Sequence, residues 1–283
     1  MKEVLLETLL DSVKMLPFLL VAYLIIEYME HRAGDKLAAM LGGSGKYGAF
    51  GGAVLGVLPQ CGFSVAASNF YAGHVITRGT LIAVFLSTSD EAIPILLSSP
   101  GNGKALMCII GIKVVLAMAA GYLIDLWDRK RGKSNLCAEA HHDICDHCGC
   151  ESRGIWQAAI HHTVTVFLFI LLVSFVMNSV FFAFGEENVS RFLLTGQFLQ
   201  PLVTAAFGFV PNCATSVILT ELYLEGGISF GSVVAGLAVG AGIGIAVLFR
   251  VHRDLKENLK IAGLLYLIGA GAGMLLQFLN IGI

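Results

Sequence analysis

Residues 59–64 read PQCGFS, and residues 211–216 read PNCATS. The second copy begins 152 residues after the first (residue 59 to residue 211), and this offset persists without a gap far beyond the motif. Pairs of identical residues at the same offset include Gly56 and Gly208, Tyr71 and Tyr223, Lys104 and Lys256, and Gly121 and Gly273. One offset over so long a stretch indicates an internal duplication.

Each copy places a proline, a side-chain amide and a cysteine inside an apolar segment. Proline removes one backbone N–H donor from a helix and leaves a carbonyl oxygen without its partner. In a lipid bilayer such a break is tolerated only where it is buried in protein or lines a cavity. Interrupted segments at matching positions of two halves are typical of a transporter's binding site. We therefore expect broken helices at both motifs, either as re-entrant hairpins or as interrupted spans.

The composition is that of a membrane protein. Of the 283 residues, 56% are hydrophobic and only 13% are charged, which predicts an all-α polytopic protein embedded in a lipid bilayer. A net charge of −2 gives no reason to expect a nucleic-acid partner. The chain has no Walker or HExxH motif, and no CxxC beside a cofactor motif, so we do not expect an enzyme.

Apolar segments follow the same order in both halves of the chain. They cover 12–29, 37–58, a short piece to 73, 76–97 and 105–126, and then 156–183, 192–210, a short piece to 225, 228–249 and 261–281. The full segments are long enough to cross a bilayer, which takes about 20 residues. We therefore divide the chain into a first membrane repeat (1–128), a Cys/His-rich linker (129–154) and a second membrane repeat (155–283), with five helical elements in each repeat.

The positions of lysine and arginine favour one topology. If each broken segment enters and leaves on the same face, most of the 18 Lys and Arg residues lie on the cytosolic side, including the basic clusters near 129–133 and 250–260. Each half then makes an odd number of passes, so the halves are inverted and both termini lie outside. The alternative, in which each broken segment crosses once, gives parallel four-span halves and places one of those clusters outside.

The two motifs supply a candidate substrate site near the middle of the membrane. Amide oxygen, thiol sulfur and hydroxyl oxygen together suit a borderline or soft metal cation or a thiophilic metalloid better than Na⁺ or Mg²⁺. The candidate ligands are Gln60, Cys61, Ser64, Asn212, Cys213 and Ser216.

Charged residues inside the predicted spans extend this site. Asp90 and Glu91 lie in the stretch STSDEAIP, and carboxylates inside a membrane are costly and usually functional. Lys113 lies at a similar predicted depth in the next span, so we expect it to pair with one of these acids and to couple cargo binding to a conformational change. Glu221, in the short segment after PNCATS, is a further candidate ligand or proton acceptor.

The linker contains the sequence CAEAHHDICDHCGC at residues 137–150. Thiolate and imidazole groups select zinc, copper(I), cadmium and similar ions. We interpret the linker as a cytosolic segment that collects or senses metal, with a flexible linker as the alternative. Its candidate ligands are Cys137, His141, His142, Cys145, His147, Cys148 and Cys150.

Taken together, PQCGFS, STSDEAIP, the central Cys/His-rich loop and PNCATS resemble a family of bacterial ten-span heavy-metal exporters. Members of this family carry the names arsenic efflux protein and manganese transporter, and they are distantly similar to organoarsenical permeases. The resemblance implies an efflux permease with duplicated halves in the bacterial cytoplasmic (inner) membrane. It leaves the substrate open because the family's own names disagree.

Two functions follow from these residues. The first is secondary-active export of a divalent cation such as Mn²⁺, Zn²⁺ or Fe²⁺, coupled to protons or to the membrane potential, which the oxygen ligands Asp90 and Glu91 favour. The second is efflux of a trivalent arsenical, which would depend on the thiols of Cys61 and Cys213. A metal channel is a weaker alternative, and a homo-oligomer stays open. No resident cofactor is required, since the metal ion is the substrate.

Overall fold

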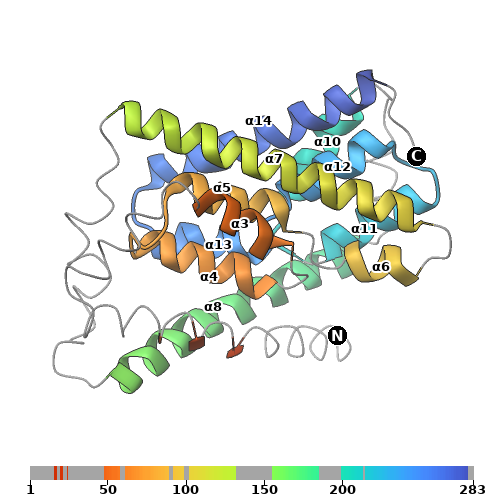
Figure 1. The fold of residues 1–283 in the computed structure, drawn as a ribbon. Coiled ribbons are helices and arrows are strands. Elements are labelled where there is room, and N and C mark those ends of the chain that lie inside the picture. The colour runs from red at the N-terminus through yellow and green to blue at the C-terminus, as the bar shows by residue number, and fades with distance from the viewer. Residues whose placement is uncertain are drawn as a thin grey trace.

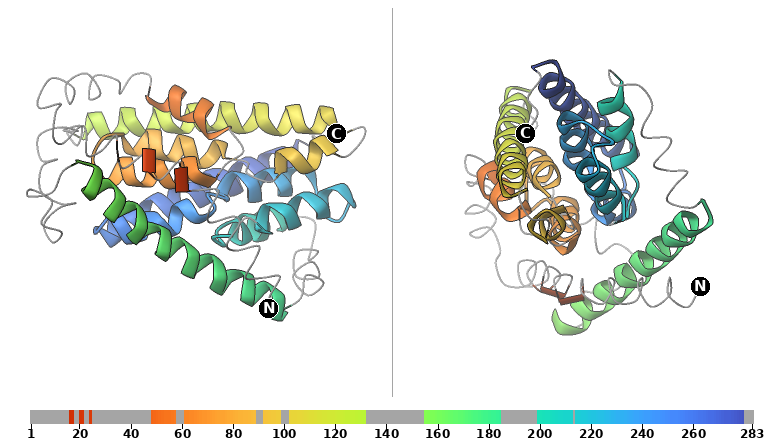
Figure 2. Two further views of the ribbon diagram at one scale, coloured as in Figure 1. Left: turned by 90° about the horizontal axis from the view of Figure 1, so that it is seen from below. Right: turned by 90° about the vertical axis from the view of Figure 1, so that its right-hand side faces the viewer.

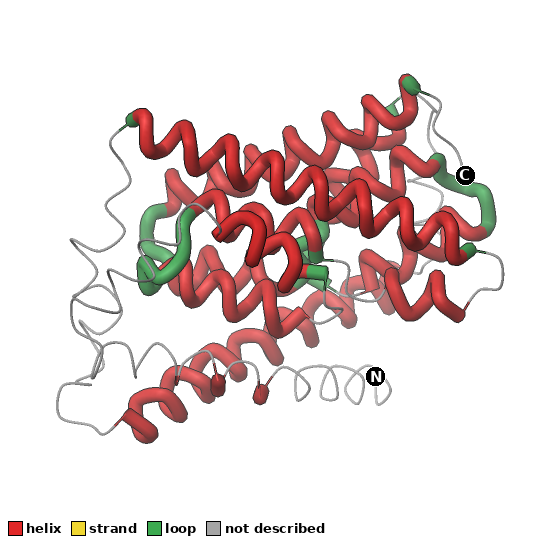
Figure 3. The backbone as a smooth tube through the Cα atoms, viewed as in Figure 1, coloured by secondary structure: helices red, strands yellow, loops and turns green. Residues whose placement is uncertain are grey.

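The computed structural model describes part of the chain. The described residues are 16, 17, 20, 21, 24, 48–57, 61–88, 92–98, 102–131, 155–184, 199–212 and 214–279. Throughout these residues the regular secondary structure is helical (Figures 1 and 3). The helices are α3 (Gly48–Gly56), α4 (Cys61–Ala72), α5 (Arg78–Ser87), α6 (Ala92–Ser98), α7 (Gly103–Lys130), α8 (Ile155–Phe184), α10 (Gln200–Gly208), α11 (Ala214–Leu224), α12 (Phe230–Val239), α13 (Ile243–Val251) and α14 (Leu255–Phe278).

The expected membrane protein is confirmed at the level of helix length and composition. Among the described residues, four stretches are long and apolar enough to cross a bilayer: Arg78–Leu97, Gly103–Lys130, Phe230–Val251 and Leu255–Phe278. The first and third are mostly buried inside the bundle, whereas the second and fourth expose most of their surface. The outer helices α7 and α14 therefore present apolar side chains to lipid, and the pairs α5–α6 and α12–α13 form the interior.

The segments 76–97 and 228–249 do not form continuous helices as the apolar runs predict. The first contains α5 and α6 as separate helices, and the second is divided between α12 and α13. At the second break Gly242 has φ 54° and ψ −141°, a backbone conformation that residues with a side chain rarely adopt. At the first break Thr88 leaves the helical region with φ −57° and ψ 129°. Hydropathy depends only on how apolar the residues are, so it does not reveal where the backbone changes direction within an apolar run.

In the first half, helices α3 and α4 lie beside α5. Gly48 at the start of α3 lies against Thr80, and Gly56 at its end lies against Ser87, so α3 runs alongside α5 in the same direction. Helix α4 is joined to α5 by a turn at residues 73–77 and returns toward the start of α5. In the second half α10 runs alongside α12 in the same direction, because Thr204 donates to the carbonyl of Ser232 at 2.8 Å and Gly208 at the end of α10 lies against Gly236.

Helices α5 and α12 begin at opposite ends of the bundle. We name the end that carries Arg129, Lys130 and Arg253 the basic end, on the left in Figure 1. Helix α5 begins there, because Thr77 Oγ1 donates to Asp125 Oδ2 near the end of α7 at 2.9 Å. Helix α12 begins at the opposite end, where the Ser229 hydroxyl donates to Gln277 near the end of α14 at 3.4 Å.

The bounds of the helices reproduce the 152-residue offset. Shifting α3 (48–56) and α5 (78–87) by 152 gives the bounds of α10 (200–208) and α12 (230–239). The N-caps match as well, since Thr77 accepts from the amide of Thr80 and Ser229 accepts from the amide of Ser232. In both halves the turn before the cap contains a residue of positive φ, His74 in the first and Gly226 in the second.

The halves are interlocked through their returning helices. Helix α4 packs along α13, and α11 packs against α6. Ser68 Oγ of α4 donates to the carbonyl of Gly244 at 2.7 Å, and at the basic end the ring of Tyr71 lies 5.2 Å from that of His252. Seen end-on in Figure 2, the helices of the two halves form adjoining groups, with α8 inclined beside them. The interior between the groups is where the breaks of α5 and α12 lie.

Candidate functional site

The C-terminal ends of α5 and α12 meet near the middle of the bundle. Each helix has ten residues, so each extends about 15 Å from its own end, which is half of the roughly 30 Å hydrocarbon core of a bilayer. Their C-caps are Thr88 and Gly240, which occupy matching positions at the 152-residue offset. The amide of Thr88 donates to the carbonyl of Val84, and that of Gly240 donates to the carbonyl of Gly236, both at 3.0 Å.

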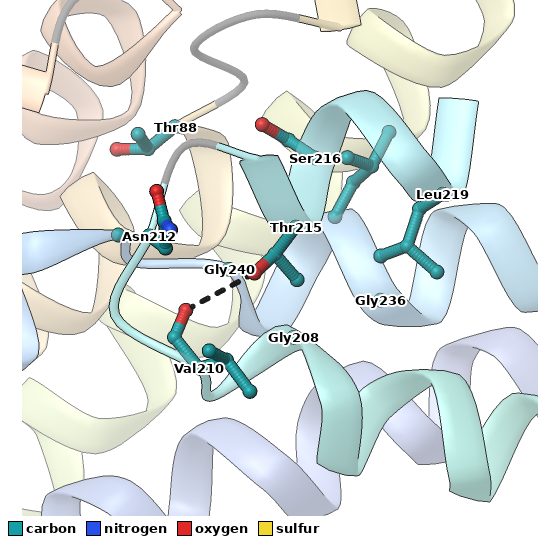
Figure 4. Close-up of a pocket in the computed structure, with 11 residues that line it drawn as sticks. Thr88, Gly208, Val210, Asn212, Thr215, Ser216, Leu219, Gly236 and Gly240 are labelled. Atoms are coloured by element: carbon teal, nitrogen blue, oxygen red, sulfur yellow. Dashed lines mark hydrogen bonds between the residues drawn. The ribbon is translucent and has the colours of Figure 1, made fainter. Parts of the chain in front are cut away.

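A pocket opens beside these helix ends (Figure 4). It combines the end of α5, the PNCATS motif and the glycine-rich break between α12 and α13. Its lining residues are Thr88, Gly208, Val210, Asn212, Thr215, Ser216, Leu219, Gly236, Leu237, Gly240 and Gly242. One half of the chain contributes Thr88 and the other half contributes the rest, so the pocket lies between the two halves.

The PNCATS motif ends one helix and begins the next. Helix α10 stops at Gly208, and the amide of Asn212 donates to the carbonyl of Val210 at 2.8 Å. Asn212 Oδ1 accepts from the amide of Ala214 at 3.2 Å, which caps the start of α11. Thr215 Oγ1 donates to the carbonyl of Val210 at 3.4 Å, the hydrogen bond drawn in Figure 4. The asparagine predicted as a ligand therefore also holds the backbone of the break.

The two predicted serines occupy different surroundings. Ser216 lines the pocket, as predicted for a site residue. Ser64, its counterpart in the first copy, is fully buried on α4, where a Cβ added at Gly244 would lie 2.8 Å from its hydroxyl oxygen. Its carbonyl accepts from Ser68 Oγ at 2.9 Å. The structure therefore brings Asn212 and Ser216 together at the pocket and places Ser64 at the contact between α4 and α13.

Lys113 is fully buried in the middle of α7. Its Nζ donates to the backbone carbonyl of Thr88 and, at 2.6 Å, to the backbone carbonyl of Leu237. Both of these residues line the pocket, so the ammonium group is hydrogen-bonded to two residues of the pocket lining. We predicted that Lys113 pairs with Asp90 or Glu91. Both acids lie outside the described residues, so this pairing stays a prediction.

Glu221 has an exposed side chain on α11 and is not part of the described pocket lining. Several other predicted ligands lie outside the described residues. These are Gln60, Cys213, the side chain of Cys61, and the linker residues Cys137, His141, His142, Cys145, His147, Cys148 and Cys150. Among the residues that the structure does describe, no group of three or more His, Cys, Asp and Glu side chains is placed to hold a metal ion.

Three contributors to the site were not singled out from the sequence. Thr88 belongs to STSDEAIP and Thr215 to PNCATS, and in both motifs the neighbouring residues were the predicted ligands. The carbonyl of Leu237 has no sequence signature of its own. The nearby glycines at 240 and 242 are the signal that could have indicated a helix end there.

The described lining of the pocket is polar but carries no carboxylate. It offers one amide, three hydroxyl groups and the backbone of two helix breaks, and it lies beside the first turn of α11, the positive end of that helix. Such a lining can replace part of the hydration shell of a bound ion or a small oxygen-rich solute.

Comparison with known proteins assigns the chain to a family. The model of the family described as "Putative, 10TM heavy-metal exporter" matches residues 1–195, which is more than half of the chain. No curated protein and no solved structure matches the chain.

Proposed function

The chain belongs to the 10TM heavy-metal exporter family, and from this premise we propose that it is a secondary-active transporter that exports a divalent transition or heavy-metal cation such as Mn²⁺, Zn²⁺ or Fe²⁺. The observation that carries the proposal is the pocket between the two halves, lined by Asn212, Thr215, Ser216 and Thr88 at half the depth of the bundle. Amide, hydroxyl and carbonyl oxygens are suitable ligands for such cations when carboxylates complete the site. We assign that role to Asp90 and Glu91 and place the protein in the bacterial cytoplasmic membrane.

We further propose that the halves are inverted repeats with re-entrant hairpins at PQCGFS and PNCATS. The opposite starting ends of α5 and α12 and the matching caps at Thr77 and Ser229 support this arrangement. Inverted repeats with broken helices at their interface allow a central site to open alternately to either side. Rocking of one half against the other is then the transport movement.

Coupling is proposed to use protons or the membrane potential, because no nucleotide-binding motif is present in the sequence. The acids Asp90, Glu91 and Glu221 are the candidate proton carriers, and the buried Lys113 responds to the charge state of the site. The linker at 137–150 is proposed to collect metal on the cytosolic side.

A trivalent arsenical is the second candidate substrate, favoured by one specific observation. The described pocket lining has no carboxylate, and the ammonium of Lys113 donates to the carbonyls of two lining residues, Thr88 and Leu237. A nearby positive charge disfavours a cation but not an uncharged, hydroxyl-rich solute. In this alternative the thiols of Cys61 and Cys213 bind the arsenic.

A binding screen separates these candidates. The purified protein is heated with Mn²⁺, Fe²⁺, Zn²⁺, Cd²⁺, Cu⁺ or arsenite, as the intact chain and as a version without residues 137–150. A ligand that binds the native state raises its stability by mass action. We expect one divalent cation to stabilise both versions and D90N to remove the effect. Stabilisation by arsenite that depends on Cys61 and Cys213 would instead establish the second candidate.

Transport itself is measured in liposomes that contain a metal-sensitive dye. Loss of one ligand oxygen costs on the order of 1–3 kcal/mol, so we expect N212A and S216A to lower the apparent affinity by about 5- to 150-fold. The matched control is T165A, which alters an exposed threonine of α8. Transport rates equal to the control in both pocket variants would contradict the assignment of this pocket. A rate that is unchanged when the pH gradient is collapsed would exclude proton coupling.

A further inference from the structure

One buried ammonium group joins the ends of two helices that belong to different halves. Lys113 of α7 donates to the carbonyl oxygen of Thr88 at the end of α5 and to that of Leu237 in the last turn of α12. The residue that carries this charge has no exposed surface. An ammonium group in such a place is stable only when oxygen atoms replace the water that it has lost.

Both carbonyl groups are available because the helices end where they do. In a continuous helix the carbonyl of Leu237 would accept from the amide of Ala241, but that amide donates to the carbonyl of Val239 at 2.7 Å. Thr88 is the C-cap of α5, so its own carbonyl lies beyond the last helical turn. The breaks therefore leave two backbone oxygens, one from each half, directed to the same nitrogen.

The electrostatics at this point favour a cation. Each helix carries the equivalent of about half a negative charge at its C-terminus, and α5 and α12 approach the centre from opposite ends of the bundle. Two negative helix ends in a low-dielectric interior repel each other unless a positive charge lies between them. Freed carbonyls at the ends of half-helices are the groups with which membrane transporters bind small monovalent cations.

We propose that the carbonyl oxygens of Thr88 and Leu237 belong to a cation site that the ammonium of Lys113 fills in this conformation, and that a free monovalent cation of similar size, NH₄⁺ or K⁺, binds there when the ammonium is absent. Both carbonyl-bearing residues line the pocket, so the site borders the space where a free ion would enter. The site concerns a monovalent cation and is distinct from the proposed metal substrate. Its test measures binding and not transport, so its failure would leave the proposed export function untouched.

The test compares two neutral replacements of the lysine. K113M removes both the charge and the hydrogen-bond donors at nearly constant volume, whereas K113Q supplies an uncharged N–H₂ group to the carbonyls. Thermal midpoints of the purified proteins are measured in ammonium, potassium, sodium and choline chloride at equal ionic strength. We expect the midpoint of K113M to rise by about 3 °C or more, saturably, with NH₄⁺ or K⁺ relative to choline. K113Q and the unaltered protein should show no such difference.

Two outcomes overturn the proposal. In the first, K113M folds and has the same midpoint in every salt. In the second, K113Q folds but K113M fails to fold in all four salts. This result would mean that the carbonyls need a donor attached to the chain and do not bind a free ion. If neither variant folds, acylation of Lys113 in the unaltered chain decides, with the exposed Lys104 of the same helix as the internal reference. Labelling of Lys113 relative to Lys104 that rises saturably with NH₄⁺ or K⁺ supports the site, and a constant ratio overturns it.

Discussion

Tyr71 at the end of α4 donates its hydroxyl proton to Glu257 in the first turn of α14, with 2.8 Å between the two oxygens. The residues are 186 positions apart and belong to different halves. Beside them the ring of Tyr71 lies against that of His252, whose Nδ1 is 2.6 Å from Asn258 Oδ1. These contacts hold the two halves together at the basic end of the bundle.

The first prediction removes this hydrogen bond. Y71F keeps the ring but leaves the carboxylate of Glu257 without the phenol donor, so we expect a loss of about 1 kcal/mol in the free energy of unfolding. The matched control is Y122F, which alters an exposed tyrosine on the outer face of α7. Thermal unfolding in detergent measures both variants, and an equal effect of the two would show that the contact between the halves contributes nothing.

The second prediction concerns Asp125, which is buried in α7 and caps the neighbouring helix. Its carboxylate accepts from Thr77 Oγ1 at 2.9 Å and from the amide of Gly79 at 3.0 Å. D125A leaves the buried Gly79 amide and the half-buried Thr77 hydroxyl without this acceptor, so we expect a loss of about 2 kcal/mol in the free energy of unfolding.

The control for this change is at the matching position of the other half. Q277A removes an acceptor that is 3.4 Å from the Ser229 hydroxyl, a weaker hydrogen bond, and should cost less than D125A. D125N retains one acceptor oxygen, so its loss in the free energy of unfolding should lie between those of Q277A and D125A. A greater loss in Q277A than in D125A, measured by the same unfolding assay, would contradict this account.

The third prediction concerns close packing between α12 and α14. A Cβ atom added at Gly273 would lie 2.5 Å from the carbonyl oxygen of Gly231 and from Cβ of Ala235. G273A must therefore separate the helices, which we expect to cost about 1–3 kcal/mol. Two residues earlier on the same helix, Gly271 has no atom within 4 Å of such a Cβ, and G271A should gain up to about 1 kcal/mol from helix propensity. Equal thermal midpoints of the two variants would exclude tight packing here.

Much of the helix arrangement was predictable because it rests on patterns that the sequence records directly. The apolar runs placed the outer helices α7 and α14, and the motifs placed the end of α10 and the start of α11 around Asn212. Proline in an apolar segment has one physical consequence, the loss of a backbone donor, so its effect can be anticipated. The family resemblance, confirmed by the match over residues 1–195, rests on the same motifs.

The two backbone carbonyls that accept from Lys113 were not predictable by the same means, while its pairing with Asp90 or Glu91 stays a prediction. A rule that pairs opposite charges at equal depth considers side chains, whereas the described partners are the backbone carbonyls of Thr88 and Leu237. Every residue has a carbonyl, and only a helix end makes it available. The relevant signal was the pair of glycines at 240 and 242, which hydropathy scores as part of an unbroken span. The role of Asp125 was hidden for a similar reason, because its acceptor function depends on which helix lies beside it.

The last prediction concerns pH and the start of α14. Asp254 is the N-cap of this helix, and its Oδ1 accepts from the amides of Glu257 and Lys256 in the loop between the spans. The hydrogen bond from the Glu257 amide favours the charged form and lowers the pKa of the Asp254 carboxyl below its ordinary value. The folded state therefore binds this proton less readily than the unfolded state, so the cap stabilises the helix above the ordinary pKa and loses its effect as the pH falls through the lowered one.

We expect the hydrogen-exchange protection of the Glu257 amide to decrease between about pH 5 and about pH 3, after correction for intrinsic exchange. D254N retains a capping oxygen that does not titrate, so its protection should be nearly constant over this range. The internal reference is the amide of Ser232, which is bonded to the non-titrating cap Ser229 at 3.2 Å. If D254N showed the same decrease as the unaltered protein, the pH dependence would have to come from another group, such as Glu257 at its contact with Tyr71.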